Sequence, residues 1–95
     1  MPKQTNLHQA IAKLETQTET KNFLRDLLTP AEITEFETRF DIATLLWTTN
    51  LSYAKIAKKL KTSTTTVTRV ARFLYKEPHR GYALILKRLH GKSVR

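Results

Sequence analysis

The sequence of 95 residues contains no cysteine, and this absence excludes disulfides, thiolate chemistry and cysteine-based zinc sites together. Glycine occurs twice and proline three times, which favours long helices with few tight turns. Stretches in which β-branched and polar residues alternate are nearly absent, so the pattern does not predict strands. The length fits one domain, 1–95, and we expect an all-α fold of about six helices.

Several functional patterns are also missing. No apolar run approaches the length of a membrane span and no apolar leader follows the first residues, so we expect a cytoplasmic protein without membrane contact. The three histidines are scattered, and none stands with a carboxylate at metal-ligand spacing, which predicts no metal site. The sequence has no nucleophile-and-base pair, P-loop or dinucleotide fingerprint, and we therefore expect no enzyme.

The charge is divided unequally along the chain. Residues 1–50 contain five Lys/Arg and seven Asp/Glu, a net charge of −2, whereas residues 51–95 contain twelve Lys/Arg and one acid, Glu77, a net charge of +11. A solubilising surface usually mixes both signs. The charge of the second half therefore indicates a surface that binds a polyanion, with nucleic acid as the expected partner.

The spacing of apolar residues predicts three helices in the first half of the chain. Two of them, over 5–18 and 20–28, form an N-terminal segment (1–28) that packs internally or against a second copy of the chain. The sequence Thr29-Pro30-Ala31-Glu32 has the pattern of a capping box, with proline at the first helical position. It predicts a long central helix over 29–49.

The second half is expected to contain a helix-turn-helix over 51–76 and a last helix over 78–91. Ser52 and Ser63 are suited to cap the two short helices of the motif, with a turn at Lys61-Thr62 between them. Pro78 is expected to start the last helix and Gly91 to end it.

The core positions of the motif support this prediction. Ile56 and Leu60 lie one turn apart on its first helix, and Val67 and Val70 share the inner face of the second. Ala57 stands where the two helices cross, and only a small side chain allows that approach. One position departs from the usual motif, because Lys61 stands where the turn favours a positive φ and usually has glycine.

The outward face of the motif carries groups that could bind DNA. Threonine and arginine side chains of the second helix can contact base edges or phosphates, and a lysine stripe on the first helix is expected to position the DNA backbone. Two alternatives stay open: the threonine run is a loop or a strand, and the lysine stripe is only a solvated face. The predicted DNA-binding residues are Lys55, Lys58, Ser63, Thr64, Thr65, Thr68, Arg69 and Arg72.

These motifs, with Arg39, Leu51-Ser52-Tyr53, Gly81-Tyr82 and Leu86–Leu89, resemble the Trp repressor family and within it the YerC/YecD-like branch. The resemblance covers residues 28–89. It implies an intertwined homodimer with two reading heads and a palindromic operator in double-stranded DNA. It also implies that Thr66 lies near an operator phosphate, which adds Thr66 to the DNA-binding residues.

The resemblance also raises tryptophan as a corepressor. It implies a ligand site at Thr29, Arg39, Thr66 and Arg69, where the two arginines would sandwich an indole. Two positions do not match, because Val70 and Phe73 stand where the family has glycine and serine. These larger apolar side chains are expected to fill the cavity, so we predict no cofactor and no use of L-tryptophan. Arg39 is then expected to pair with Glu35, to pair with an acid on another helix, or to keep a residual anion site.

The sequence therefore predicts a dimeric, sequence-specific DNA-binding transcription regulator that acts as a repressor. The alternative is a helical adaptor, or an RNA-binding or architectural DNA-binding module with little sequence specificity. Trp47 is expected in the core or the dimer interface rather than stacked on a base. A basic tail adds nonspecific affinity or is frayed surface; it comprises Lys87, Arg88, Lys92 and Arg95.

Overall fold

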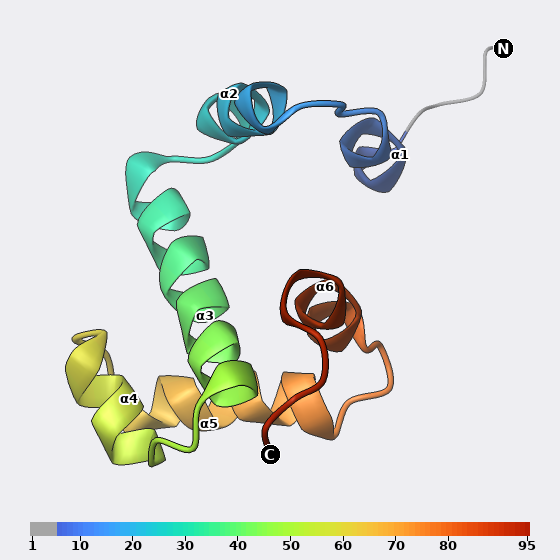
Figure 1. Ribbon diagram of the computed structural model, residues 1–95. Coiled ribbons are helices and arrows are strands. Elements are labelled where there is room, and N and C mark those ends of the chain that lie inside the picture. Colours follow the sequence, from blue (N-terminus) through green and yellow to red (C-terminus); the bar gives the residue numbers. More distant parts are fainter. Residues whose placement is uncertain (1–5) are drawn as a thin grey trace, which may run out of the picture. The chain divides into compact units, whose positions relative to one another are not determined.

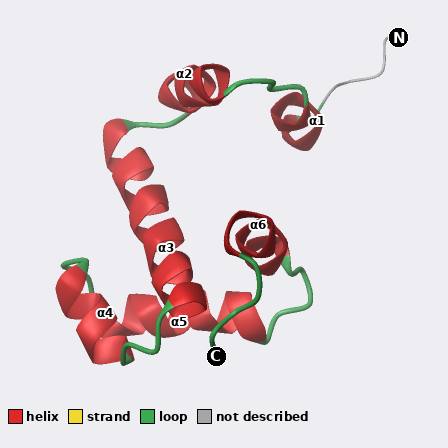
Figure 2. Ribbon diagram, in the orientation of Figure 1, coloured by secondary structure: helices red, strands yellow, loops and turns green. Residues whose placement is uncertain are grey.

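The computed structural model describes residues 6–95, which form six helices and no strand (Figures 1 and 2). This confirms the all-α prediction. No helix within this range is both long enough and apolar enough to cross a membrane. The chain divides into an N-terminal unit, residues 1–34, and a C-terminal unit, residues 35–95. The helices are α1 (Leu7–Ala12), α2 (Gln17–Leu27), α3 (Pro30–Thr48), α4 (Tyr53–Lys59), α5 (Thr64–Tyr75) and α6 (Gly81–His90).

The two helices of the N-terminal unit are separated earlier in the chain than the apolar spacing predicts. The expected break near residue 19 is wrong, because Thr16 begins α2 as its N-cap and accepts a hydrogen bond from the Glu19 backbone N–H at 3.0 Å. Asn6 begins α1 with a capping box that involves Gln9. Leu14 stands in helical register with Ile11 although it lies between the two helices, so spacing alone did not reveal where α1 ends. The predicted first helix also included Thr5, which lies outside the described residues.

Neither α1 nor α2 has a buried side chain. Leu7 is 47% exposed, Ile11 44% and Leu27 47%. Apolar side chains are thus exposed on both helices of the N-terminal unit taken by itself.

The central helix begins and ends as the sequence predicts. The Glu32 backbone N–H donates to Thr29 Oγ1 at 3.2 Å, and the Glu32 carboxylate accepts from the Thr29 backbone N–H at 2.9 Å. This reciprocal pair is the predicted capping box, with Pro30 as the first helical residue. The helix ends at Thr48, after which the Thr49 hydroxyl donates back to Leu45 O.

The core lies in the C-terminal unit and joins four helices. The C-terminal end of α3 contributes Ile42, Ala43, Leu46 and Trp47, and α4, α5 and α6 supply the remaining buried side chains. Trp47 is therefore a core residue, as expected. Its indole Nε1–H donates to Gly91 O at 2.7 Å, which satisfies its polar group. The other members of the cluster are Ile56, Ala57, Val67, Val70, Ala71, Leu74, Ala83 and Leu86.

The α4–α5 pair is a helix-turn-helix with the predicted caps. Ser52 accepts from the Lys55 backbone N–H at 3.1 Å, and Ser63 accepts from the Thr66 backbone N–H at 3.1 Å. Ala57 is 5% exposed, so it lies at the crossing as the spacing predicts. The threonine run is helical throughout α5, which excludes the loop and the strand.

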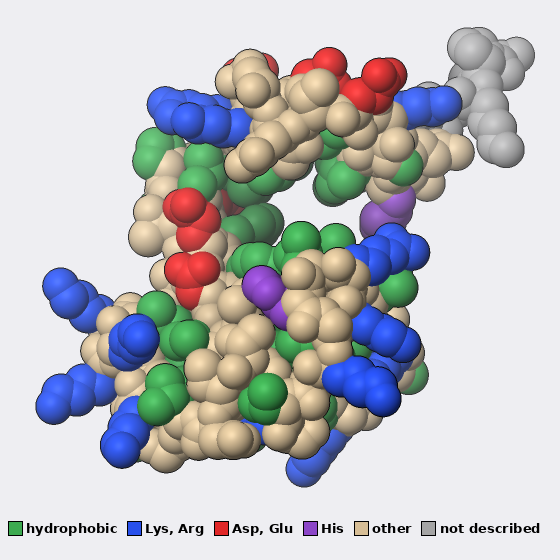
Figure 3. All heavy atoms as spheres, in the orientation of Figure 1, with side chains coloured by type: hydrophobic (Ala, Val, Ile, Leu, Met, Phe, Trp, Pro, Cys, Tyr) green, Lys and Arg blue, Asp and Glu red, His purple; other side chains and the backbone are tan. Residues whose placement is uncertain are grey.

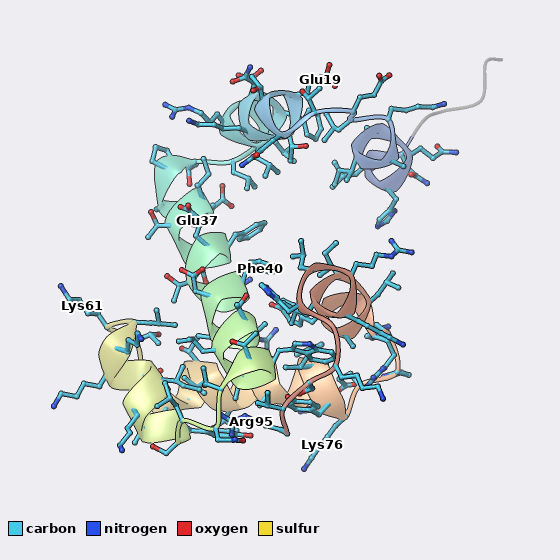
Figure 4. All side chains as sticks on the ribbon, viewed as in Figure 1. Glu19, Glu37, Phe40, Lys61, Lys76 and Arg95 are labelled. Carbon is cyan, nitrogen blue, oxygen red and sulfur yellow. The ribbon has the colours of Figure 1, made fainter. Side chains whose placement is uncertain are left out.

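The turn between α4 and α5 satisfies the last carbonyls of α4 through a left-handed residue. Lys61 has φ 55°, its N–H donates to Lys58 O at 3.3 Å, and the Thr62 N–H donates to Ala57 O at 2.9 Å. These two bonds form a Schellman motif, in which glycine is the usual left-handed residue. The lysine adopts this conformation, and its side chain points away from the helices (Figure 4).

The last helix starts later than predicted. Pro78 lies in a turn, and α6 begins at Gly81 after Arg80, which has φ 60° and no side-chain cap bond. The predicted start at Pro78 is therefore wrong, although proline suits a first helical position. The predicted end is confirmed, because Gly91 follows the helix with φ 77° and its N–H donates to Lys87 O.

Lys61→Gly is expected to raise the free energy of unfolding by about 1 kcal/mol relative to Lys61→Ala, because only glycine adopts a left-handed conformation without strain. Both substitutions remove the same charge and side chain, so their difference reports the backbone. Urea denaturation of the two variants measures it. Equal midpoints would show that the turn carries no strain.

Candidate nucleic-acid interface

Helix α4 presents basic side chains to solvent. Lys55, Lys58 and Lys59 are all exposed, while Ile56 and Ala57 between them are buried. Lys58 and Lys59 lie in the last turn of the helix. Basic side chains project from this side of the unit in Figure 3. The predicted lysine stripe is therefore present, on the face of α4 that does not enter the core.

Helix α5 presents a polar outward face. Thr64, Thr65 and Thr68 are exposed, whereas Val67 and Val70 are buried on the opposite side. A shallow hollow of about 440 Å³ follows this face. It is lined by Thr64, Thr65, Thr68, Arg69, Arg72 and Phe73. Five of the predicted DNA-binding residues thus share one surface.

Some hydroxyls on α5 are already engaged within the helix. Thr68 Oγ1 donates to Thr64 O at 2.8 Å, which leaves its lone pairs and methyl group outward. Ser63 Oγ and Thr66 Oγ1 lie 2.9 Å apart, and Ser63 also accepts from the Thr66 backbone N–H. Ser63 therefore caps the helix and Thr66 is its partner, while Thr64 and Thr65 form no side-chain hydrogen bond within the described part of the chain.

Arg72 is held by the one acid of the cationic half. Its Nε donates to Glu77 Oε1 at 2.9 Å, and the side chain stays 68% exposed. The Glu77 backbone N–H also donates to Arg72 O, where α5 ends. The two terminal guanidinium nitrogens of Arg72 stay available to an external acceptor, while its Nε is paired with Glu77.

A second hollow lies between α3, α5 and α6. It has a volume of about 530 Å³ and an apolar lining with two guanidinium groups, those of Arg39 and Arg69. Phe40 points from α3 toward α6 on this side (Figure 4). Val70 and Phe73 line the hollow but leave it open, so the expectation that they fill it is wrong for this chain.

Both guanidinium groups of this hollow have partners from the chain itself. Arg39 Nη2 donates to Glu35 Oε1 at 2.6 Å, one turn away, as the sequence predicts. Arg39 Cζ lies 5.7 Å from the centre of the Phe36 ring, and Arg69 Cζ lies 5.1 Å from that of Phe73. These distances place each cation over a phenyl ring, where the ring quadrupole attracts it.

Three of the four residues assigned to a ligand site meet on one surface. Arg39, Thr66 and Arg69 line a further hollow of about 360 Å³, together with the carboxylate of Glu35. Thr29 belongs to the N-terminal unit, where its hydroxyl accepts the capping bond from Glu32. The described contacts of Thr29 are therefore those of a helix cap.

Helix α6 provides a part of the larger hollow that the sequence pattern did not predict. Tyr82 and Ile85 line it one turn apart, Gly81 lines it as the first residue of α6, and His79 lines it from the turn before the helix. The spacing of Tyr82 and Ile85 marks a face of α6, but nothing in that spacing identifies its partner. Phe36 and Phe40 on α3 give a similar signal at a spacing of four.

The fold and these surfaces define a helix-turn-helix protein with an exposed threonine- and arginine-bearing second helix. The chain matches the family described as Trp repressor protein over residues 3–90. It therefore belongs to the Trp repressor family, a family of regulators.

Two solved structures are similar to it. A candidate Trp repressor from Staphylococcus aureus is 32% identical with a TM-score of 0.80, covering 92% of this chain and 85% of that one. A TrpR-like protein from Eubacterium eligens is 35% identical with a TM-score of 0.77, covering 87% of this chain and 84% of that one. No curated protein matches the chain.

The hollow between the arginines affects the ionisation of Tyr82. Burial raises the pKa of this phenol above 10.0, and the charges of Arg39 and Arg69 lower it in part. We expect Arg69→Gln to raise the pKa further because it removes a nearby cation, while Arg88→Gln on exposed α6 surface leaves it unchanged. NMR titration of ring-labelled tyrosine measures both, and a fall in Arg69→Gln would contradict the geometry.

The same shift has a consequence for stability. Because the folded-state pKa of Tyr82 exceeds the ordinary 10.0, the folded chain retains this proton at a pH where the unfolded chain loses it. The contribution of Tyr82 to stability is complete below pH 10.0 and decreases as the pH rises through the folded-state value. Tyr82→Phe should remove the loss of stability that comes from ionisation of Tyr82 above pH 10.0.

Proposed function

We propose that this protein is a transcription regulator that binds specific sites in double-stranded DNA and acts as a repressor. The observation that carries the proposal is the outward face of α5, where Thr64, Thr65 and Thr68 stand exposed beside Arg69 and Arg72. In helix-turn-helix proteins the second helix enters the major groove and its N-terminal residues contact base edges. The exposed threonines occupy the first turns of α5.

The neighbouring groups suit the phosphate backbone. Lys55 and Lys58 are exposed on α4, next to the turn that leads into α5. Contacts from such positions fix the register of a protein on a duplex without reading sequence. The net charge of +11 over residues 51–95 supplies the long-range attraction. Base reading is assigned to α5 and backbone contact to α4.

We propose further that the working form is a homodimer on a palindromic operator. The N-terminal unit exposes Leu7, Ile11 and Leu27 and buries none of the side chains of α1 and α2. In the C-terminal unit Phe36 is 47% exposed and Leu89 57%. A second copy of the chain would cover such apolar faces, and two reading heads would then match two half-sites.

We propose that L-tryptophan is not the corepressor. The hollow of about 530 Å³ falls in the size range of small-molecule sites, so its volume does not decide the question. The partners of the arginines favour the proposal. Arg39 lies over Phe36 and is bonded to Glu35, and Arg69 lies over Phe73, so rings of the chain occupy a face of each cation.

Selection of bound sites from random duplex DNA tests the main proposal. A palindromic site should emerge, and Arg69→Ala should weaken its binding by roughly 1–3 kcal/mol if Arg69 makes a bidentate base contact. Arg88→Ala removes the same charge from α6 and serves as the control. Equal affinity for random duplex, single strand and RNA would instead support an architectural or RNA-binding module.

The salt dependence of binding tests the assignment of α4. Replacing both Lys55 and Lys58 by glutamine should reduce the slope of log affinity against log salt by about 0.9 for each lost phosphate contact. The base preference of the selected site should stay the same, because these lysines do not read sequence. A slope equal to that of the original protein would show that Lys55 and Lys58 of α4 do not contact DNA phosphates.

Titration calorimetry with L-tryptophan tests the corepressor proposal. No binding is expected in the micromolar range, and operator affinity should be the same with and without the amino acid. L-Leucine provides the control for nonspecific heat. Saturable micromolar binding that Arg69→Ala abolishes would overturn this proposal and leave DNA binding itself intact.

A further inference from the structure

Residues 91–95, here called the C-terminal strap, run back along the end of α3. Gly91 O accepts from Trp47 Nε1 at 2.7 Å, and the Val94 N–H donates to Trp47 O at 2.9 Å. Arg95 Nε donates to Leu46 O at 2.8 Å, at the C-terminal end of α3 (Figure 4). The strap thus bonds to the helix through its backbone and through one arginine side chain.

These bonds satisfy groups that the helix leaves free. The last four carbonyls of an α-helix have no partner within the helix, and a cation there also complements the helix dipole. Leu46 O accepts from Arg95 and also from the Tyr75 hydroxyl, at 3.2 Å. Trp47 O accepts from Val94. The end of α3 is therefore capped by a segment about 45 residues away in the sequence.

Arg95 also connects α3 to the turn that leads into α4. A second guanidinium nitrogen, Nη2, donates to Leu51 O, just before the N-cap Ser52. Ser93 Oγ lies 3.0 Å from the hydroxyl of Tyr75, the last residue of α5. The strap therefore touches both ends of the helix-turn-helix, the start of α4 and the end of α5.

This arrangement bears on one of the two options for the basic tail. The side chain of Arg95 is exposed but not frayed, because its guanidinium group is bonded to two backbone carbonyls. Lys92 is exposed and forms no side-chain bond among the described residues. The match to the Trp repressor family ends at residue 90, so the strap lies outside the matched segment.

We propose that Arg95 is a positioning residue that fixes the α4–α5 pair on the end of α3 and thereby sets DNA affinity without touching DNA. The guanidinium fork suits this role because its planar donors can hold two carbonyls in a fixed relation. The inference rests on the proposed function, since it concerns the reading surface on α5.

The test compares Arg95→Gln with Lys92→Gln, which removes the same charge from the same segment. Arg95→Gln should lower affinity for the selected duplex about tenfold, while the slope of log affinity against log salt stays unchanged. An effect of this size is typical of residues that act on a binding site through other residues. Lys92→Gln should leave specific affinity within about twofold, the size of a single exposed charge. Arg95→Lys keeps the charge but not the fork, so it should restore only part of the affinity.

Two results would overturn the proposal. Equal affinities of Arg95→Gln and Lys92→Gln would show that the strap does not position the reading pair. A loss of affinity accompanied by a salt slope smaller by about 0.9 would show that Arg95 contacts a phosphate directly. Should Arg95→Gln fail to fold by circular dichroism, Tyr75→Phe removes one bond to Leu46 O and should lower affinity in the same direction. An unchanged DNA affinity of Tyr75→Phe would then overturn the positioning role of the strap.

Hydrogen exchange separates this inference from the proposed function. Amide exchange in α4 should be faster in Arg95→Gln than in Lys92→Gln, whether or not the protein binds duplex DNA. Equal exchange rates in the two variants would overturn the positioning role of Arg95 even if the original chain binds an operator. Absence of duplex binding by the original chain, with faster exchange in Arg95→Gln, overturns only the proposed function.

Discussion

The C-terminal unit depends on the burial of one face of α5. Val67, Val70, Ala71 and Leu74 of this helix are buried, and α3, α4 and α6 each pack against the same cluster. Because that face points inward, the opposite face of α5 has to point outward, and it carries the threonines and arginines.

The same burial explains why a threonine run is helical here. β-Branched residues are poor helix formers, and Thr64, Thr65, Thr66 and Thr68 all fall in the first half of α5. Ser63 offsets part of this cost as N-cap, and the apolar spacing supplies the rest through packing. A surface rich in hydroxyls and methyl groups is thus obtained on a helix whose stability comes from its other side.

Local signals made much of this fold predictable, and long-range contacts made the rest unpredictable. Ser52, Ser63 and Thr29 mark helix starts because a cap bonds within three residues, and the structure has all three bonds. The start of α2 was missed because the apolar spacing of the first helix continues to Leu14, beyond the end of α1, although Thr16 and Glu19 have the capping pattern. The start of α6 was missed because Pro78 suits a turn as well as a helix.

No local pattern in the sequence predicted the hollows or the strap. The larger hollow takes its lining from α3, α5 and α6, so its size depends on how these helices pack. The expectation that Val70 and Phe73 would close it considered only the size of their side chains. The partners of Arg95 are backbone carbonyls, which every residue has. A sequence can mark a cap that bonds within one turn, but it does not mark an arginine that caps a helix from 49 residues away.

That separation bears on how the unit folds. The bonds between the strap and the end of α3 close a loop of 44 to 49 residues that contains α4, α5 and α6. Closing a long loop loses chain entropy before its contacts form, so we expect local contacts such as those between α4 and α5 to form before the strap joins. The hydrogen bonds of the strap thus add to the packing of the core by joining the two ends of the segment that contains α4, α5 and α6.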